Sequence, residues 1–188
     1  MNDIQPNISS RQWAILLVYP LVPLVVALIT NLVVGVNRLE AALPTDAMMG
    51  FVALSVLFLI VNHTWLMTHT EVTRARFGLF ATPEEEAESD HSSQGVSNTQ
   101  ELTRSHAAHR NLTENTVHFA LALPVFLFLS PPAILAAIWL CGYATMRLGH
   151  TYFFLSGNAD MRGVCMTGSL VALYGLVTYP LISIVSSF

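Results

Sequence analysis

Uncharged apolar stretches alternate with short polar segments along most of the chain. They lie at residues 13–36, 48–70, 115–146 and 163–188. A helix crosses the hydrocarbon core of a bilayer with about 20 residues, so the first, second and fourth stretches each predict one membrane-spanning helix. The third is too long for one span, and Ser130, Pro131 and Pro132 interrupt it near its middle. It predicts two helices joined at the prolines, which brings the expected number of spans to five.

The chain divides into an N-terminal extension and a main membrane domain. The first apolar stretch is longer than the apolar region of a signal peptide, so residues 1–46 are interpreted as an extension that keeps one extra transmembrane helix at about 13–36. Cleavage after Ala42 is the alternative. Residues 47–188 are predicted to form a four-helix membrane domain, in which a segment at about 83–103, rich in Glu, Ser, Asn and Gln, indicates a flexible acidic loop.

The composition agrees with this interpretation. Hydrophobic residues make up 53% and charged residues 11% of the 188 residues, and the mean hydropathy is +0.55, which argues against an ordinary soluble domain. The expected fold class is therefore an all-α integral membrane protein. Cys141 and Cys165 lie in or beside predicted spans and are interpreted as packing residues rather than a disulfide pair. The chain carries no nucleic-acid signature, so no nucleic-acid partner is expected.

The basic residues set the expected orientation of this multi-pass protein. All eight are arginines, and with five spans only Arg38 falls on one side of the bilayer while the others fall on the opposite side. Basic loops tend to stay in the cytoplasm. The N-terminus is therefore predicted to be cytoplasmic and the C-terminus to lie on the opposite side.

Polar residues gather at both ends of the third stretch, where charge is costly in a membrane protein. Arg110, Asn111 and Glu114 precede it, and Arg147 and His150 follow it. Counting from the prolines at about 1.5 Å per residue places Glu114 about 25 Å, Arg147 about 24 Å and His150 about 28 Å from the turn. The two groups are therefore expected at the same depth.

Helical spacing predicts that the two groups face each other. Arg110, Glu114 and His118 follow at intervals of four residues, and Arg147, His150 and Phe154 follow at intervals of three and four. Residues at such intervals lie on one side of a helix, so each helix is predicted to point its set toward the other.

Five arginines end or begin predicted spans on the cytoplasmic side: Arg74, Arg76, Arg110, Arg147 and Arg162. Guanidinium groups bind carboxylates in bidentate geometry, and the oxygens of Asn111 and Glu114 accept hydrogen bonds from an ammonium group. The cluster therefore suits a ligand with carboxylates and an amine. Two alternatives stay open: the arginines extend to lipid headgroups as topology markers, or Glu114 forms a structural ion pair with Arg110.

A haem or metal site is a weaker interpretation of the histidines. Those in or near predicted spans are His63, His69, His118 and His150. A haem with two axial imidazoles needs both at one depth, whereas His118 and His150 differ in depth by several residues. His106 and His109 form a His-x-x-His pair, but no cysteine ligand lies near them in sequence. Neither a metal nor a haem is expected.

The motifs that contain the polar residues resemble those of a known family. Residues 109–115, His-Arg-Asn-Leu-Thr-Glu-Asn, resemble the second-helix signature of the MAPEG superfamily, the membrane-associated proteins of eicosanoid and glutathione metabolism. The segments around Arg74 and Arg147 look like the family's first and third helices, and Arg162 matches the arginine that opens its last helix. The resemblance covers about 48–188 and leaves the helix at 13–36 as an addition.

The resemblance implies a homotrimer of MAPEG-like four-helix bundles in contact with membrane lipids, with glutathione bound as co-substrate in cytoplasm-facing clefts between subunits. The residues expected to bind glutathione are Arg74, Arg110, Asn111, Glu114, Arg147, His150 and Phe154, with Arg162 nearest the thiol as the catalytic residue. The implied activity is that of a glutathione-dependent transferase or peroxidase, in which the thiolate attacks lipophilic electrophiles or hydroperoxides.

Three positions depart from the family pattern. Phe154 stands where many members have a tyrosine, Ala107 replaces a common arginine, and Gly163 stands where some members have a serine. The family also includes a non-catalytic lipid-binding activator. A non-catalytic membrane scaffold that binds a lipid or a protein partner is therefore the alternative function.

Overall fold

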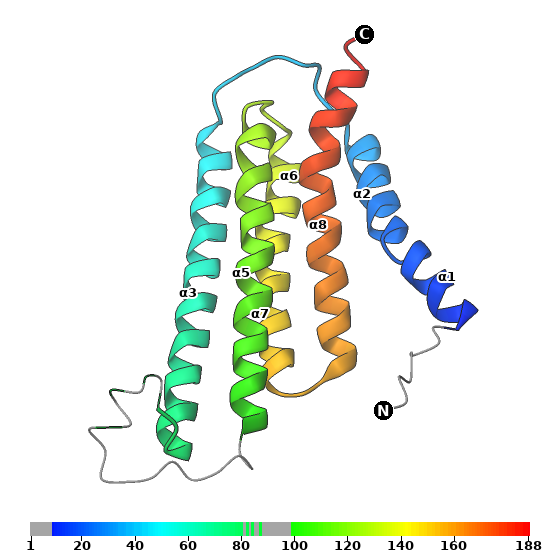
Figure 1. Cartoon of the computed structure of the whole chain (residues 1–188). Helices are drawn as coiled ribbons and strands as arrows, with labels where there is room; N and C mark the ends of the chain where they lie inside the picture. Colours follow the sequence, from blue (N-terminus) through cyan, green and yellow to red (C-terminus); the bar gives the residue numbers. More distant parts are fainter. Residues whose placement is uncertain (1–8, 81, 83, 85–86, 88–98) are drawn as a thin grey trace.

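The computed structural model describes residues 9–80, 82, 84, 87 and 99–188. Helices dominate this part of the chain, and no strand occurs in it. The helical segments are α1 (Ser10–Val18), α2 (Leu21–Val34), α3 (Asp46–Phe77), α5 (Thr99–Leu127), α6 (Ala133–Ala136), the π-helical turn η2 (Ala137–Cys141), α7 (Gly142–Leu155) and α8 (Ala159–Val185). Because α6, η2 and α7 follow one another without a gap, they form one continuous rod (Figure 1).

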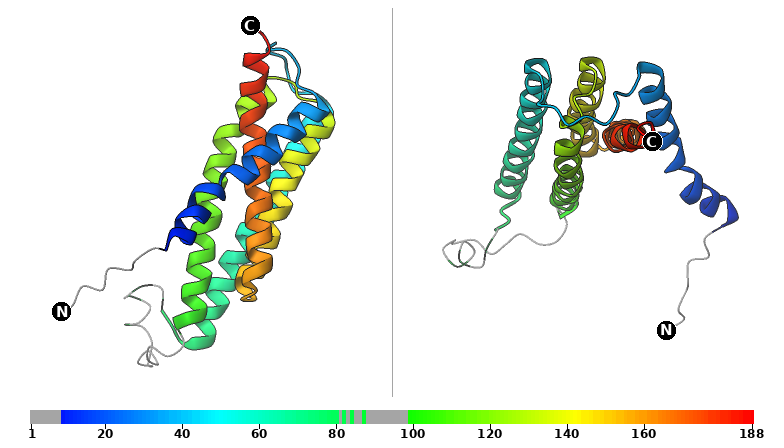
Figure 2. Two further views of the ribbon diagram at one scale, coloured as in Figure 1. Left: turned by 90° about the vertical axis from the view of Figure 1, so that its right-hand side faces the viewer. Right: turned by 90° about the horizontal axis from the view of Figure 1, so that it is seen from above.

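Four long rods stand side by side, namely α3, α5, α8 and the rod that ends in α7 (Figures 1 and 2). The α7 segment packs against the other three, and α2 packs along α8. Aromatic side chains fill much of the core: Phe119 stacks on Tyr143 at a centroid distance of 4.4 Å, and Phe126 meets Tyr179 edge-on at 5.4 Å. The predicted all-α bundle with an additional N-terminal helical segment is confirmed.

The predicted turn at the paired prolines is also confirmed. The chain leaves α5 at Leu127 and enters α6 after Pro132, and Ser130 between them has a positive φ of 43°. Asn37 Nδ2 donates a hydrogen bond to the Ser130 carbonyl over 2.8 Å. This bond ties the segment that follows α2 to the turn.

The first apolar stretch is not one helix, so the prediction of a single helix at 13–36 is wrong. The stretch breaks at Tyr19 and Pro20, and α1 leaves the break in a different direction from α2 (Figure 1). Proline has no N–H to donate to the preceding turn, and its ring crowds the carbonyl four residues earlier. Pro23 causes no second break, because it lies in the first turn of α2, where backbone N–H groups have no partner within the helix.

A buried asparagine attaches α2 to the bundle. Asn31 is fully buried, and its Nδ2 donates to the Gly175 carbonyl and to Thr178 Oγ1, each over 3.0 Å. The indole Nε1 of Trp139 donates to Asn31 Oδ1 over 2.8 Å. Gly175 leaves room for that indole, because a Cβ on Gly175 would lie 2.3 Å from Trp139 Cδ2. The added helix is therefore joined to η2 and α8 by specific polar contacts.

Two helices extend further than the apolar pattern indicated. Beyond residue 70, α3 continues to Phe77, and Gly78 follows it with a left-handed φ of 61°. Because α5 begins at Thr99, residues 99–103 are helical, and the prediction that the flexible loop reaches residue 103 is wrong. Glu101 favours this earlier start, since an acidic side chain in the first turn interacts well with the helix dipole. Residues 83, 85–86 and 88–98 of the predicted loop lie outside the described residues.

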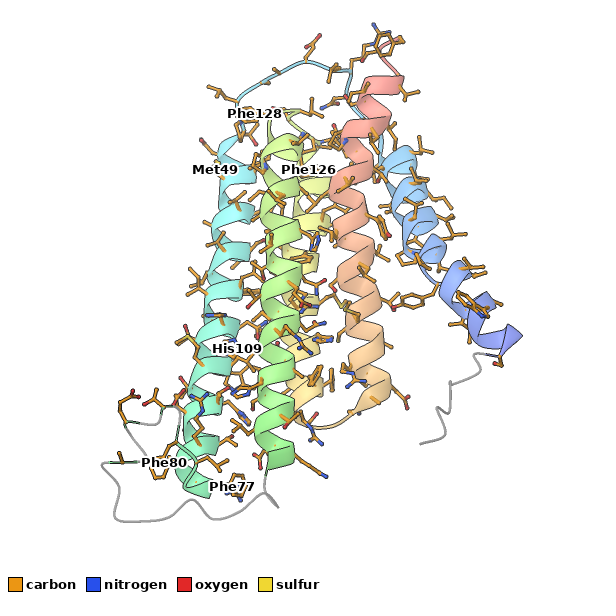
Figure 3. All side chains as sticks on the ribbon, viewed as in Figure 1. Met49, Phe77, Phe80, His109, Phe126 and Phe128 are labelled. Carbon is orange, nitrogen blue, oxygen red and sulfur yellow. The ribbon has the colours of Figure 1, made fainter. Side chains whose placement is uncertain are left out.

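The described helices have the length and surface of a membrane protein. Two of them, α3 and α8, are long and apolar enough to cross a membrane, and α2 is a shorter apolar helix of 14 residues. Large apolar side chains are exposed along these helices, including Leu57, Val164 and Leu181. Figure 3 shows side chains along the full height of the bundle, with Met49 and Phe128 near one end and Phe77 near the other. The number of spans and their orientation stay predictions.

Candidate functional site

Arg147 on α7 and its hydrogen-bond partner Asn111 on α5 form a polar layer inside the bundle. The Arg147 side chain is fully enclosed in the bundle. Nη2 donates to two acceptors of Asn111 on α5, the side-chain Oδ1 at 2.6 Å and the backbone carbonyl at 3.0 Å. Nη1 donates to the sulfur of Met166 on α8 at 3.6 Å. The polar ends of α5 and α7 therefore meet at one depth, as the count from the proline turn indicated.

The stripe formed by Arg110, Glu114 and His118 is exposed on α5 instead of facing α7. The prediction that both helices point these sets toward each other is therefore wrong. Neighbouring residues of a helix differ in direction by about 100°, so Arg110 points away from α7 when Asn111 faces it, and Glu114, four residues after Arg110, lies on the same exposed side. Over the described part of the chain, Glu114 makes no ion pair with Arg110. The structural ion pair considered from the sequence does not form.

Arg162, at the start of α8, lies over the ring of Phe154 on α7. Its Cζ is 4.9 Å from the ring centroid, which is within the range of a cation–π interaction. His150 is almost fully buried and packs against the same ring, with centroids 5.6 Å apart. Within the described residues, Arg162 has no acidic partner. Its half-buried guanidinium is therefore held by the aromatic ring and not by a carboxylate of the described chain.

Arg74 belongs to a separate cluster near the end of α3. Its Nη1 donates to Glu71 Oε1 over 2.7 Å, and its Nη2 lies 3.2 Å from His106 Nε2 on α5. The structure thus brings Arg147 to Asn111, and Arg162 to His150 and Phe154. It does not bring Arg74, Arg110 or Glu114 into hydrogen-bonding contact with either pair.

A row of histidines, which no sequence pattern predicted, joins α3 to α5. The rings of His63 and His109 meet edge-on at a centroid distance of 4.9 Å, and His69 Nδ1 is hydrogen-bonded to Ser105 Oγ at 2.9 Å. No group of three or more His, Cys, Asp or Glu residues suited to a metal ion occurs in the described ranges. His118 is exposed on α5 whereas His150 is buried in the bundle, so the two imidazoles considered for haem lie in different environments.

Other buried polar residues near the layer were also missed. Asn62 on α3 and Thr151 on α7 are buried, and their side-chain polar atoms have no hydrogen-bond partner among the described residues. A sequence signal existed for Thr151, because it follows Arg147 by four residues and therefore lies on the same face of α7. No such signal marked Asn62, which lies beside His63 and Thr64 in an apolar stretch of α3, or Met166, which is itself an apolar residue of α8.

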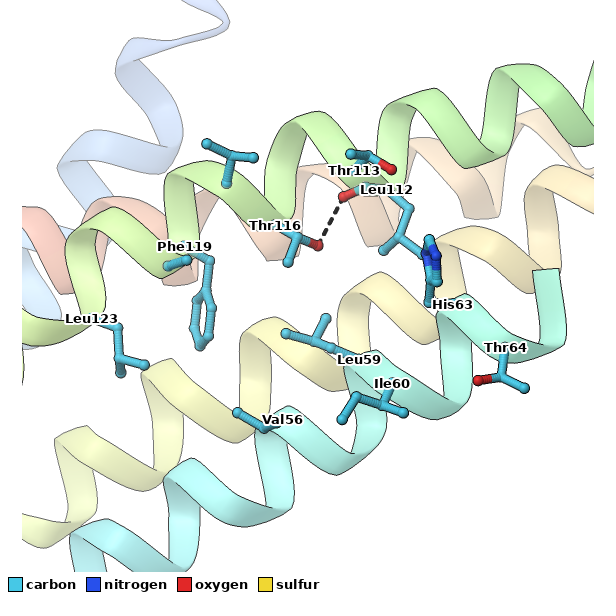
Figure 4. A pocket seen from close by; sticks show the side chains of 12 residues that line it. Val56, Leu59, Ile60, His63, Thr64, Leu112, Thr113, Thr116, Phe119 and Leu123 are labelled. Atoms are coloured by element: carbon cyan, nitrogen blue, oxygen red, sulfur yellow. Dashed lines mark hydrogen bonds between the residues drawn. The ribbon is translucent and has the colours of Figure 1, made fainter. Parts of the chain in front are cut away.

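Two apolar grooves run along α5, on either side of the polar stripe. One, of about 470 Å³, lies between α3 and α5, with His63 toward one end and Phe119 and Leu123 toward the other (Figure 4). The second, of about 550 Å³, lies between α5 and α8. It begins at His118, one turn from Glu114, and continues past Leu121 along α5.

Fold and site together define a class: an all-α membrane protein whose helical bundle encloses a buried arginine and carries further arginines around it. The sequence profile of the MAPEG family matches residues 52–182, well over half of the chain, and the chain belongs to this family. The match begins within α3 and ends within α8, so α1 and α2 lie outside it. No curated protein matches the chain. Family membership supports a general role in glutathione-related or eicosanoid metabolism at a membrane, and the family contains both enzymes and non-enzymes.

Proposed function

We propose that the protein is a glutathione-dependent transferase or peroxidase that acts on lipophilic electrophiles or hydroperoxides. The observation that supports this most directly is the half-buried guanidinium of Arg162, which lies beside His150 and Phe154 without an acidic partner in the described chain. Glutathione carries two carboxylates, an ammonium group and a thiol. Arg74 and Arg110 suit the carboxylates, Glu114 suits the ammonium group, and Arg162 suits the thiol.

The proposed chemistry is activation of the glutathione thiolate. A free thiol has a pKa of about 8.5, and a neighbouring guanidinium lowers it, so more thiolate is present at neutral pH. With an electrophile, the thiolate sulfur forms a bond to carbon and the leaving group departs with the electron pair. With a hydroperoxide, the sulfur attacks the terminal oxygen and the O–O bond breaks, which gives an alcohol and an oxidised sulfur. A second glutathione then forms the disulfide and releases water.

The groove between α5 and α8 supports a lipophilic second substrate. It begins one turn from Glu114, and apolar side chains such as Leu121, Val125 and Leu173 line it. A substrate dissolved in the bilayer would place its apolar part in this groove and its reactive atom near the polar end of α5.

The exposed stripe on α5 supports a homotrimer. Glu114 and Arg110 are exposed on a helix that packs within a membrane bundle, and an ionised carboxylate there costs several kcal/mol unless it is paired. A neighbouring copy would cover this face and complete the glutathione cleft between subunits. Sizing the purified protein in detergent tests this, since a monomeric protein would contradict the trimer.

The orientation of the chain is proposed on the positive-inside rule. The bundle end that carries Arg74, Arg110 and Arg162 would face the cytoplasm, together with the N-terminus. Labelling of a cysteine introduced near Arg38 tests this proposal, because a membrane-impermeant reagent added outside should reach it. If the cysteine is labelled only after the membrane is opened, the orientation is the reverse of the one proposed.

Conjugation of glutathione to chlorodinitrobenzene tests the activity. Wild-type protein should form the conjugate, and Arg162→Ala and Glu114→Ala should each reduce kcat/KM by at least about tenfold, since each removes a charged contact. Arg38→Ala is the matched control, because Arg38 follows α2 at the opposite end of the bundle. An inactive wild type, or unchanged activity in both site variants, would refute the catalytic proposal.

The second candidate is a non-catalytic binding or scaffold protein. Phe154 favours it, because a phenyl ring rather than a hydroxyl lies against Arg162 and offers no hydrogen bond to a ligand. Calorimetric titration with glutathione separates the two functions. The enzyme proposal predicts saturable binding below millimolar ligand, and the scaffold proposal predicts none.

A further inference from the structure

Arg147 has no direct access to a ligand outside the bundle, because its side chain is fully buried among α5, α7 and α8. We infer that Arg147 is a positioning residue that fixes the amide of Asn111 as a hydrogen-bond donor to an anionic group of bound glutathione. The inference rests on the proposed function and assigns Arg147 an indirect role in it. Asn111 would be the residue that contacts the ligand.

The geometry determines which way the Asn111 amide points. A guanidinium group only donates hydrogen bonds, so the oxygen of the amide must face Arg147, and the 2.6 Å contact is from Nη2 to Oδ1. The backbone carbonyl of Asn111 is held as well, by Nη2 at 3.0 Å and by Asn115 Nδ2 at 2.8 Å. With its oxygen bound to Arg147, the Asn111 side chain keeps Nδ2 and both of its hydrogens outside this contact.

That nitrogen is free to bind a ligand. Asn111 is half-buried, and its Nδ2 donates no hydrogen bond to any residue that the structure describes. It lies on the same helical turn as Arg110 and Glu114, the proposed contacts for a carboxylate and the ammonium group. A donor at this position suits an anionic group of the same ligand.

The buried charge strengthens this donor. Arg147 has no carboxylate partner in the described part of the chain, so its positive charge is balanced only by neutral acceptors. A charged donor polarises the amide that accepts from it, and the amide N–H in turn becomes a better donor. The buried charge of Arg147 thereby makes the Asn111 Nδ2 on α5 a stronger hydrogen-bond donor, although Arg147 itself is not exposed to a ligand.

A purely structural tie between α5 and α7 is the competing explanation, and a substitution at position 111 distinguishes the two. Asn111→Asp keeps an oxygen facing Arg147 and converts the contact into an ion pair, but it removes both Nδ2 donors. A structural tie predicts unchanged glutathione affinity and equal or higher thermal stability. The positioning role predicts that the affinity for glutathione falls by at least about tenfold while the full-length protein stays folded.

A double-mutant cycle tests whether Arg147 acts through Asn111. Calorimetric glutathione affinity and KM would be measured for Arg147→Gln, Asn111→Ala and the double variant of the full chain, with Arg147→Lys as the conservative variant. Arg147→Gln should raise Kd and KM for glutathione by about tenfold and change kcat at saturating glutathione by less than about twofold. It should have little further effect once Asn111 is alanine, and Arg147→Lys should restore part of the affinity.

Arg104→Gln is the matched control. Arg104 is also an arginine that joins α5 to α7, since its Nη1 donates to the Leu155 carbonyl over 3.3 Å, but it lies outside the proposed glutathione set. Its substitution should leave glutathione affinity unchanged. Additive effects of Arg147→Gln and Asn111→Ala, or wild-type affinity in Asn111→Asp, would overturn the positioning role while leaving the proposed function intact. Wild-type protein that binds no glutathione would overturn both.

Discussion

The attachment of the added helix α2 offers the sharpest test of the fold. Asn31→Ala removes the three hydrogen bonds that its side chain makes with Gly175, Thr178 and Trp139. At about 1 kcal/mol for each bond, the loss is about 3 kcal/mol, and the buried indole N–H of Trp139 is left without its acceptor. For a chain of this length, such a loss corresponds to a fall in Tm of about 6–12 °C.

Thermal unfolding in detergent, followed by far-ultraviolet circular dichroism, measures this change. Thr30→Ala is the matched control, because Thr30 precedes Asn31 on α2 and its hydroxyl bonds only to Val26 within the same helix. The control should melt within about 2 °C of wild type. If Asn31→Ala melts together with the control, α2 is not held to the bundle by this polar contact and the reasoning fails.

Three further predictions concern packing, the ligand and the groove. Gly175→Ala should destabilise the protein by about 1–3 kcal/mol, because the new Cβ would meet the Trp139 indole, and a Tm equal to that of wild type would contradict this contact. Phe154→Tyr should lower the Kd for glutathione by about threefold to tenfold through an added hydroxyl, whereas an unchanged or raised Kd would exclude Phe154 from the ligand's surroundings. Leu121→Trp should fill the α5–α8 groove and raise KM for a bulky apolar electrophile without changing KM for glutathione. Leu57→Trp, on the exposed surface of α3, is its control. Equal effects of the two substitutions on KM would show that the substrate does not bind in the groove.

The prolines illustrate how far the fold could be predicted from the chain. Pro131 and Pro132 were correctly assigned to a turn, because two adjacent prolines after Ser130 leave the backbone little choice. Pro124 and Pro180, in contrast, lie inside α5 and α8, and both helices continue through them. A proline inside a helix removes one backbone hydrogen bond, and packing in the folded bundle decides whether the helix survives that loss. Local sequence could not distinguish Pro20, which ends a helix, from these two.

The sequence by itself determined the class of protein, the family motifs and the depth of the polar layer. Apolar length sets what can cross a bilayer, and the constant rise of a helix brings the polar group that includes Asn111 and the polar group that includes Arg147 to similar depths on either side of the proline turn. Only the tertiary structure decided which faces meet. If α5 were rotated about its axis by one residue, Arg110 would face α7 in place of Asn111. The spacing of the polar residues along the sequence would be the same in both arrangements. Packing among several helices selects the rotation, so Asn111 binds the buried guanidinium while Arg110 and Glu114 remain on the outer surface.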